Sequence, residues 1–321
     1  MTLEQMEKFI VRYADLKPCK TAFIDAHTPG SNQKENFTII GSGVSESPDQ
    51  HVHIKQTPGF NIGAAGQPPG CINSLHSHTT AEVFYVFKGK WRFFWGQYGD
   101  SGEVIAEEGD LINIPTGIFR AFENIGSDYG MLMAILGGDD AGGGVKWAPK
   151  VINDAKDFGL ILGEDGLLYD SKKGQSLPDS IKPMPLLTEE ELKGFPEITT
   201  EDFLNNFFVS SSELHQKSKN KPVKVIGREA ILKDRPGFEV DFITNDSFVN
   251  KPYASNRHEV NMIMNGEWEL HWDSKKTNLG PGDTCLIPPN LDHKLVPRKI
   301  GNASLFRVTN TDDPAGSTWL R

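Results

Sequence analysis

The chain has 321 residues, of which 37% are hydrophobic and 24% charged, and its formal net charge is −10. This length favours two domains of about 150 residues each. The negative charge argues against a nucleic-acid partner, whose phosphates would repel it, and the apolar runs are shorter than the roughly 18 residues of a membrane helix. The N-terminus lacks the basic start and apolar core of a signal peptide, so we expect a cytoplasmic protein with no membrane partner.

Short runs typical of β-strands open the chain. Residues 37–44, 51–56 and 59–66 are rich in β-branched and aromatic residues and are separated by turn signals. Strands that recur about every 8–12 residues are typical of a β-sandwich or barrel. A second series of such strands begins near residue 222, so we expect one sandwich or barrel in each half of the chain.

An internal repeat links the two halves. Residues 82–96 align without a gap with residues 259–273, so that Glu82 falls on Glu259 and the turn glycine Gly89 on Gly266. A second pair of blocks, 107–124 and 280–297, follows in the same order. Each block that contains a turn glycine is predicted to form two strands that meet at a tight turn, because glycine readily adopts a positive φ.

The segment between the two repeats has a different pattern. Residues 147–215 contain runs with helical spacing, and Thr188 and either Thr199 or Thr200 precede acidic residues as helix N-caps do. We therefore predict three parts: an N-terminal barrel with an extension (1–146), a partly helical connector (147–215) and a C-terminal barrel (216–321).

Three side chains just before and at the start of the first repeated block have the chemistry of a metal site. His76 and His78 are two residues apart, so on a strand they face the same way, and Glu82 shares their parity. Two imidazoles and one carboxylate form a facial set that suits Fe(II), Mn(II), Ni(II) or Zn(II) and leaves other coordination positions open. A His-x-His pair alone is weak evidence, and His51 and His53 are interpreted as ordinary strand residues.

With these residues the chain resembles the cupin superfamily. Its first motif is matched by Gly70, His76, His78, Glu82 and Gly89, and its second by Gly109, Pro115, Gly117 and Asn124, whereas Arg120 stands where the motif has histidine. The repeat makes the chain similar to a bicupin. The resemblance implies an all-β fold of two jelly-roll barrels joined by the partly helical connector, a metal-binding site and a homodimer, in which the segment before residue 36 could pack across the interface.

Arg120 leaves two alternatives open. Arginine stays protonated and cannot donate a lone pair to a metal ion. Either Arg120 lies beside a three-ligand metal and anchors an anionic group of the substrate, or it pairs with Glu82 in a cavity without metal. We favour the first, in which Arg120 is a catalytic and substrate-binding residue, because a salt-bridged core would not require the two histidines.

Aromatic residues and the second barrel complete the candidate site. Trp91, Phe93 and Phe122 are candidates for contact with a planar substrate, although core packing is the default for such residues. In the second barrel Tyr253 and Ser255 replace the two histidines, which leaves Glu259 and His293 as a weak site. We interpret this barrel as mainly structural, or as a half that serves oligomerisation and shapes the substrate site.

The function that this pattern favours is a metal-dependent enzyme in the first barrel. By resemblance to quercetin and gentisate dioxygenases, we expect a dioxygenase with Fe(II) that acts on a small anionic or aromatic oxygenated substrate. Mn, Ni or Zn in place of iron, and isomerisation or decarboxylation on the same site, remain alternatives because a ligand set does not specify the reaction. The other hypothesis is a non-catalytic bicupin that binds a small anionic ligand.

Overall fold

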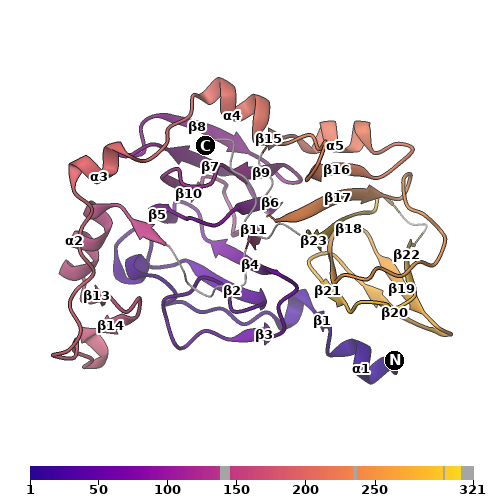
Figure 1. Cartoon of the computed structure of the whole chain (residues 1–321), viewed down its shortest axis with the longest axis horizontal. Helices are drawn as coiled ribbons and strands as arrows, with labels where there is room; N and C mark the ends of the chain where they lie inside the picture. The colour runs from indigo at the N-terminus through magenta and orange to yellow at the C-terminus, as the bar shows by residue number, and fades with distance from the viewer. Residues whose placement is uncertain (138–144, 234–236, 299–300, 312–321) are drawn as a thin grey trace.

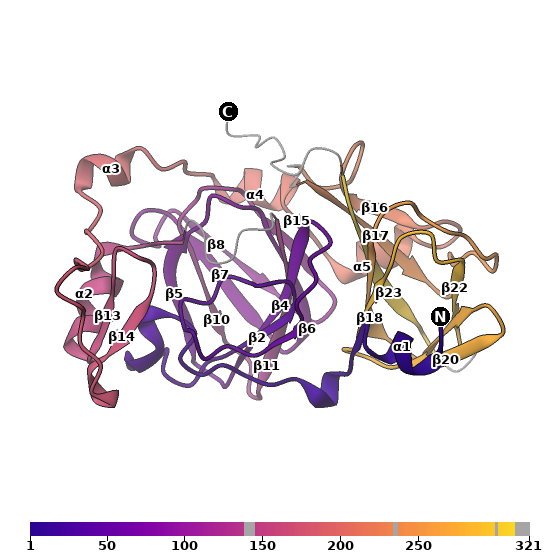
Figure 2. The same ribbon diagram turned by 60° about the horizontal axis from the view of Figure 1, so that its bottom comes forward.

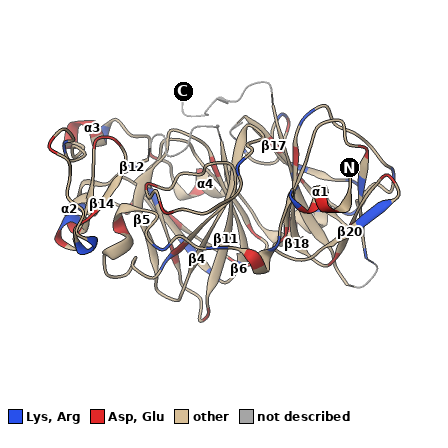
Figure 3. Cartoon of the chain, turned by 90° about the horizontal axis from the view of Figure 1, so that it is seen from below, with Lys and Arg blue, Asp and Glu red and all other residues tan. Residues whose placement is uncertain are grey.

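Two β-barrels lie side by side along the long axis of the computed structural model, and the helical connector lies beside the first (Figures 1 and 2). The structure describes residues 1–137, 145–233, 237–298 and 301–311. Acidic and basic residues are interspersed along both barrels (Figure 3). None of the helices in these ranges is long and apolar enough to cross a membrane. The predicted all-β fold is confirmed.

The first barrel has two sheets that face each other. The larger has the order β15-β9-β6-β11-β4-β2-β3, with bounds Phe208–Val209, Leu111–Ile114, Glu82–Lys88, Gly130–Gly137, Phe60–Gln67, Glu35–Ile40 and Val52–Ile54. The smaller has the order β12-β5-β10-β7-β8, with bounds Lys146–Trp147, Ile72–Ser77, Arg120–Asn124, Trp91–Trp95 and Gly102–Ala106.

The second barrel is built in the same way. Its larger sheet has the order β1-β21-β18-β23-β17-β16, with bounds Ile10–Val11, Thr284–Ile287, Glu259–Asn265, Ser304–Asn310, Phe238–Thr244 and Val223–Ile226. Its smaller sheet has the order β20-β19-β22, with bounds Lys275–Leu279, Trp268–Trp272 and His293–Pro297.

The repeated blocks form strands in both barrels, but they are not hairpins. Gly89 (φ 97°) and Gly266 (φ 68°) take the predicted positive φ between β6 and β7 and between β18 and β19. However, β6 pairs with β9 and β11, whereas β7 pairs with β8 and β10. Each glycine turn therefore carries the chain from one sheet to the facing one, which is a corner of a jelly roll. The sequence pattern predicted the strands and the turn but not their partners.

The connector contains short helices around one small sheet. Thr188 and Thr199 accept hydrogen bonds from the backbone N–H groups of Glu191 and Asp202, as predicted for N-caps. Within residues 147–215, which we predicted to be partly helical, residues 160–162 instead form a strand. The elements of the connector are α2 (Pro149–Asp157), β13 (Leu160–Leu162), β14 (Leu168–Asp170), α3 (Glu189–Lys193), α4 (Thr200–Asn206) and α5 (Ser211–Lys217), with a short 3-10 helix at Ser171–Lys173. Two further 3-10 helices, Tyr13–Asp15 and Ile24–His27, lie in the N-terminal segment.

Each barrel receives an arm from the segment that precedes the other barrel. After helix α1 (Leu3–Glu7), β1 pairs with β21 of the second barrel, while β15 of the connector pairs with β9 of the first. The arms are held alike: Trp272 Nε1 donates to the Met1 carbonyl (3.0 Å), and Trp95 Nε1 donates to the Ile198 carbonyl (2.8 Å). The extension that we predicted with the first barrel, and expected at a dimer interface, thus begins on the second barrel of the same chain.

The two larger sheets share one hydrophobic core. Phe60 of β4 contacts Phe238 of β17 with ring centroids 5.7 Å apart, and Tyr85 of β6 contacts Phe306 of β23 at 5.0 Å. Every residue of β11 is buried, because one face of this strand points into the barrel and the other points toward the second barrel. The two barrels are therefore packed together through their sheets.

The connector arm should contribute strongly to stability. Phe203 of α4 is 0% exposed and stacks on Trp95 with ring centroids 4.2 Å apart. We expect Phe203→Ala to lower the free energy of unfolding by about 3–5 kcal/mol, since it leaves a cavity against the barrel. The adjacent Leu204→Ala, at a side chain that is 42% exposed, is the matched control. Urea denaturation measures both, and equal effects would contradict this role of the arm.

Candidate functional site

The predicted metal ligands lie together inside the first barrel. His76 is near the end of β5, His78 directly follows this strand, and Glu82 begins β6. Their potential ligand atoms all lie within 4.8 Å of one another, and all three side chains are buried. The two imidazole rings are perpendicular, with centroids 5.0 Å apart. Within the described ranges this is the only such group of three or more His, Cys, Asp or Glu residues.

The donor set fits a divalent metal ion. Nδ1 of His76 lies 2.6 Å from the Ser74 carbonyl oxygen, so it carries the proton and leaves the Nε2 lone pair available. Burial, followed by the charge of Arg120, lowers the pKa of His76 and of His78 well below the usual range, so both rings are neutral. Oε1 of Glu82 lies 3.8 Å from Nε2 of His78. Two neutral imidazoles and a carboxylate oxygen thus face one another.

Arg120 is the first residue of β10, lies beside this group and is 1% exposed. Its Nε and Nη2 donate to Oε2 of Glu82, and its Nη1 donates to the His76 carbonyl oxygen (3.1 Å). Burial lowers the pKa of Arg120 although Glu82 raises it. The guanidinium is not part of the cavity lining. The structure thus shows the Arg120–Glu82 pair of the second alternative and no contact of Arg120 with the cavity, while Oε1 of Glu82 lies 3.8 Å from Nε2 of His78. The predicted role of Arg120 in catalysis and substrate binding stays a prediction.

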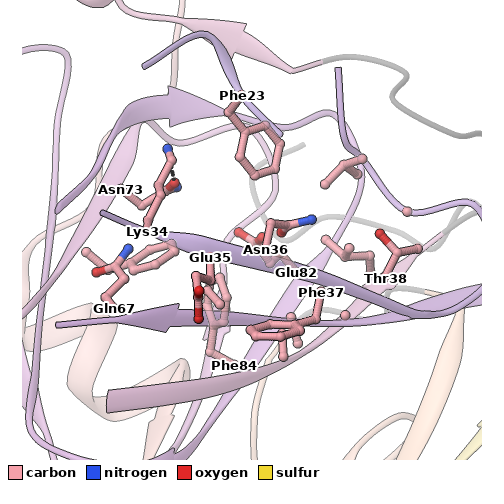
Figure 4. A pocket seen from close by; sticks show the side chains of 18 of the residues that line it. Phe23, Lys34, Glu35, Asn36, Phe37, Thr38, Gln67, Asn73, Glu82 and Phe84 are labelled. Atoms are coloured by element: carbon pink, nitrogen blue, oxygen red, sulfur yellow. Dashed lines mark hydrogen bonds between the residues drawn. The ribbon is translucent and has the colours of Figure 1, made fainter. Parts of the chain in front are cut away.

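A cavity of about 50 Å³ adjoins the group (Figure 4). A water molecule needs about 10–15 Å³ measured in this way, so the space holds a few water-sized positions. Small side chains leave this space open, among them Gly63 and Ala65 of β4 and Ala134 of β11. The other lining residues are Phe23, Lys34, Glu35, Asn36, Phe37, Thr38, Gly43, Val44, Ala64, Gln67, Asn73, His76, His78, Glu82, Phe84, Phe122 and Leu136.

The predicted aromatic contacts divide into two groups. Phe122 lines the cavity, whereas Trp91 and Phe93 pack with it in the core of the barrel and are not part of the lining. An aromatic residue that sequence reasoning missed, Trp147, has its ring 5.0 Å from that of His76. Trp147 Nε1 donates to Oε1 of the buried Glu46 (2.6 Å), which fixes this ring against the imidazole.

A polar wall of the cavity was also missed. Lys34 is 5% exposed, and its ammonium donates to Asp25 and to Oδ1 of Asn73 (2.8 Å). Gln67, at the end of β4, completes this wall (Figure 4). Lys34 and Gln67 lie outside both motifs. The only signal in the sequence was the run of small residues in β4 that precedes Gln67.

The corresponding place in the second barrel holds a hydrogen-bonded cluster. Glu259 accepts hydrogen bonds from Tyr253 Oη (2.7 Å) and Asn261 Nδ2 (2.7 Å), and it lies 3.1 Å from His293 Nε2 and 3.2 Å from Arg307 Nε. Every oxygen of this carboxylate is engaged, and a guanidinium supplies positive charge. Glu259 and His293, which we predicted as a weak site, thus contact each other, and Tyr253, Asn261 and Arg307 surround the carboxylate.

Comparison with known proteins identifies the first barrel and the fold. Residues 66–136 match the Cupin domain family, and no curated protein matches the chain. A mutant of Bacillus subtilis oxalate decarboxylase aligns with 14% identity over 97% of this chain and 79% of that chain (TM-score 0.55). The formate complex of Lactobacillus farciminis oxalate decarboxylase aligns with 12% identity over 97% and 88% (TM-score 0.56).

Vicilin from hazelnut (Corylus avellana) has a similar fold, with 12% identity over 94% of this chain and 85% of that chain and a TM-score of 0.50. These alignments confirm the predicted two-barrel cupin fold. Since proteins with different names share it, the fold does not specify an activity, which has to be argued from the site.

The Glu259 cluster should make the stability depend on acid. Burial raises the pKa of Glu259, but the hydrogen bond of His293 and the charge of Arg307 outweigh it and lower the pKa to about 2. A carboxyl group with a lowered pKa stabilises the fold above its unfolded pKa of 4.5, and this contribution is lost as the pH falls toward 2. We expect Glu259→Gln to lower the free energy of unfolding by about 3 kcal/mol at pH 7, because it unbalances a buried cluster.

Urea denaturation at pH 7 and pH 3 tests this expectation, and the difference between the two proteins should shrink at pH 3. The control is Glu267→Gln, which removes an exposed ion pair with Arg298 and should change little. A difference that is independent of pH would contradict the role assigned to the charge of Glu259.

Proposed function

We propose that the first barrel is a metal-dependent enzyme site in which His76, His78 and Glu82 hold one divalent ion. The match of residues 66–136 to the Cupin domain family supports this proposal. The observation that carries this proposal is the convergence of these three buried side chains beside a partly open cavity. Two histidines and one carboxylate with open positions are the ligand set of non-haem Fe(II) oxygenases.

The charges of the site favour an anionic substrate. The two neutral imidazoles, the Glu82 carboxylate and the Arg120 guanidinium sum to zero, so a divalent ion would leave two uncompensated positive charges in a buried space. Buried charge without a partner is costly. A small carboxylate in the cavity would supply the compensation, and a cavity of about 50 Å³ favours a small ligand.

Each protein group has a task in this proposal. When bound, the ion would supply Lewis-acid or redox chemistry at the inner end of the cavity. Arg120 holds Oε2 of Glu82 and thereby fixes which oxygen faces the histidines. Ser74 and Trp147 fix the His76 ring. Phe84, Phe122 and Leu136 exclude water from the reacting end. Within this class we propose a dioxygenase that uses Fe(II).

A second candidate function is a non-catalytic bicupin that binds a small anion. The Arg120–Glu82 pair supports it, because the guanidinium already compensates the carboxylate without a metal ion. In this alternative the two histidines would only line the ligand cavity.

Metal content separates the two candidates. We expect natively purified protein to contain about one divalent ion per chain, since a single ligand set is present. His76→Ala should lose this ion, because it removes a ligand. The exposed His51→Ala is the matched control, since it removes a histidine from another His-x-His pair. Elemental analysis measures all three proteins. No ion in the natural protein, even after anaerobic reconstitution with Fe(II), would favour the binder.

Oxygen consumption tests the type of reaction. We expect the Fe(II)-loaded protein to consume O₂ with a small carboxylate substrate, and the Zn(II)-loaded protein not to, because zinc has no redox chemistry. An oxygen electrode and a panel of C2–C4 carboxylic acids suffice, with His78→Ala as the inactive control. Turnover with release of CO₂ under anaerobic conditions would instead identify a redox-neutral decarboxylase.

A further inference from the structure

The side chain of Gln67 has no hydrogen-bond partner in the described part of the chain. Gln67 is 0% exposed, and both Oε1 and Nε2 are buried and unpaired. Its backbone is well fixed, since the Gln67 carbonyl accepts a hydrogen bond from Asn124 Nδ2 (2.8 Å) and β4 pairs with β11 and β2. Native proteins rarely leave a buried amide unpaired, because the lost hydrogen bonds with water are not replaced. A ligand in the cavity would supply the missing partners.

Gln67 faces the same cavity as the metal-ligand group. Gly63 and Ala65 alternate with it on β4 and also line the cavity, so the amide stands at the end of a row of small side chains. A Cβ at Gly63 would come within 3.0 Å of the Phe37 carbonyl oxygen, so the backbone of β2 favours glycine at this position. The unpaired amide therefore belongs to the cavity lining and is shielded from bulk solvent.

Lys34 places an ammonium group in the same lining, where the buried carboxylate of Asp25 forms an ion pair with it. An ammonium group has three donors, and two of them are directed at Asp25 and Asn73. The two carboxylates of the lining already have partners: Glu35 bonds Tyr129 and Lys20, and Glu82 bonds Arg120. The polar wall thus presents the unpaired Gln67 amide, with its NH2 donors and its carbonyl acceptor, beside the third N–H donor of Lys34.

Building on the proposed function of the first barrel, we propose that Lys34 and Gln67 form its substrate-recognition end and select a two- or three-carbon 2-hydroxy acid. The ligand carboxylate accepts from Lys34 Nζ and Gln67 Nε2, and the ligand hydroxyl donates to Gln67 Oε1. A plain carboxylate or a dicarboxylate lacks this donor and would leave Oε1 unpaired. The cavity of about 50 Å³ suits an acid of this size.

Calorimetric titration of the natural protein with glycolate, acetate and oxalate tests the selectivity. We expect glycolate to bind about tenfold more tightly than acetate, which corresponds to one additional hydrogen bond. Each titration is made with Fe(II)-loaded protein and again after removal of metal by a chelator. Equal affinity for glycolate and acetate in both forms would overturn the proposal, whether or not any variant folds.

Two variants assign the selectivity to Gln67. Gln67→Met keeps the side-chain length and removes the amide, so it should reduce the preference for glycolate to less than about twofold, leave the metal content unchanged and raise Tm in the absence of ligand, since an unpaired polar group is lost. Gln216→Met, on the exposed face of α5, is the matched control and should change none of these. A lower Tm with an unchanged preference for glycolate would show that Gln67 is structural and would overturn the proposal.

These readouts are independent of the proposed enzyme activity. If the natural protein contains no metal, the proposed function fails, while a preference for glycolate that depends on Gln67 in chelated protein still supports the recognition role. If the metal is present and the preference is absent, only the recognition role fails.

Discussion

The burial of one sheet on both faces is the constraint on which the molecule depends. In the first barrel, alternate residues of β11 point toward the second barrel (Met131, Met133, Ile135) or into the barrel's own interior (Leu132, Ala134). The outward face is filled by large apolar side chains from both barrels and is fixed by close packing. The inward face of the same sheet supplies Gln67 and Glu82. The positions of these polar groups are therefore set by packing between the barrels.

Both barrels place a glutamate at the start of the equivalent strand and neutralise it with an arginine, by different routes. In the first barrel Arg120 arrives from β10 and engages only one carboxylate oxygen. In the second, Arg307 arrives from β23 and joins three other partners around Glu259. The first arrangement leaves an oxygen and two neutral imidazoles free to bind an ion. The second engages both carboxylate oxygens within the protein, so the equivalent glutamates differ in whether an oxygen remains available.

The sequence predicted what depends on local pattern and failed where partners are distant. The strands, the positive φ of Gly89, the N-caps Thr188 and Thr199 and the convergence of the His76 group all follow from spacing along the chain. The spacing did not predict which strands pair with β6, because the alternation of residues along a strand carries no information on the neighbouring strand. The polar wall is a second example, since Lys34 and Gln67 meet the site only through the closure of the barrel. The sequence left the role of Arg120 open, because its positive charge could serve either to anchor an anionic substrate or to pair with Glu82.

The exchange of arms affects the order in which the chain can fold during synthesis. Tyr13 N–H reaches Asp283 across 270 residues, while Ser211 N–H reaches the equivalent Asp110 across 101. The first barrel can be closed by its arm as soon as the connector has left the ribosome. The arm of the second barrel precedes its partner strand β21 in the chain and can pair only after residues 284–287 have been made, at a higher entropic cost of loop closure. The two equivalent arm contacts thus differ in the length of chain that must be ordered before they form: Tyr13 and Asp283 are 270 residues apart, and Asp110 and Ser211 are 101 apart.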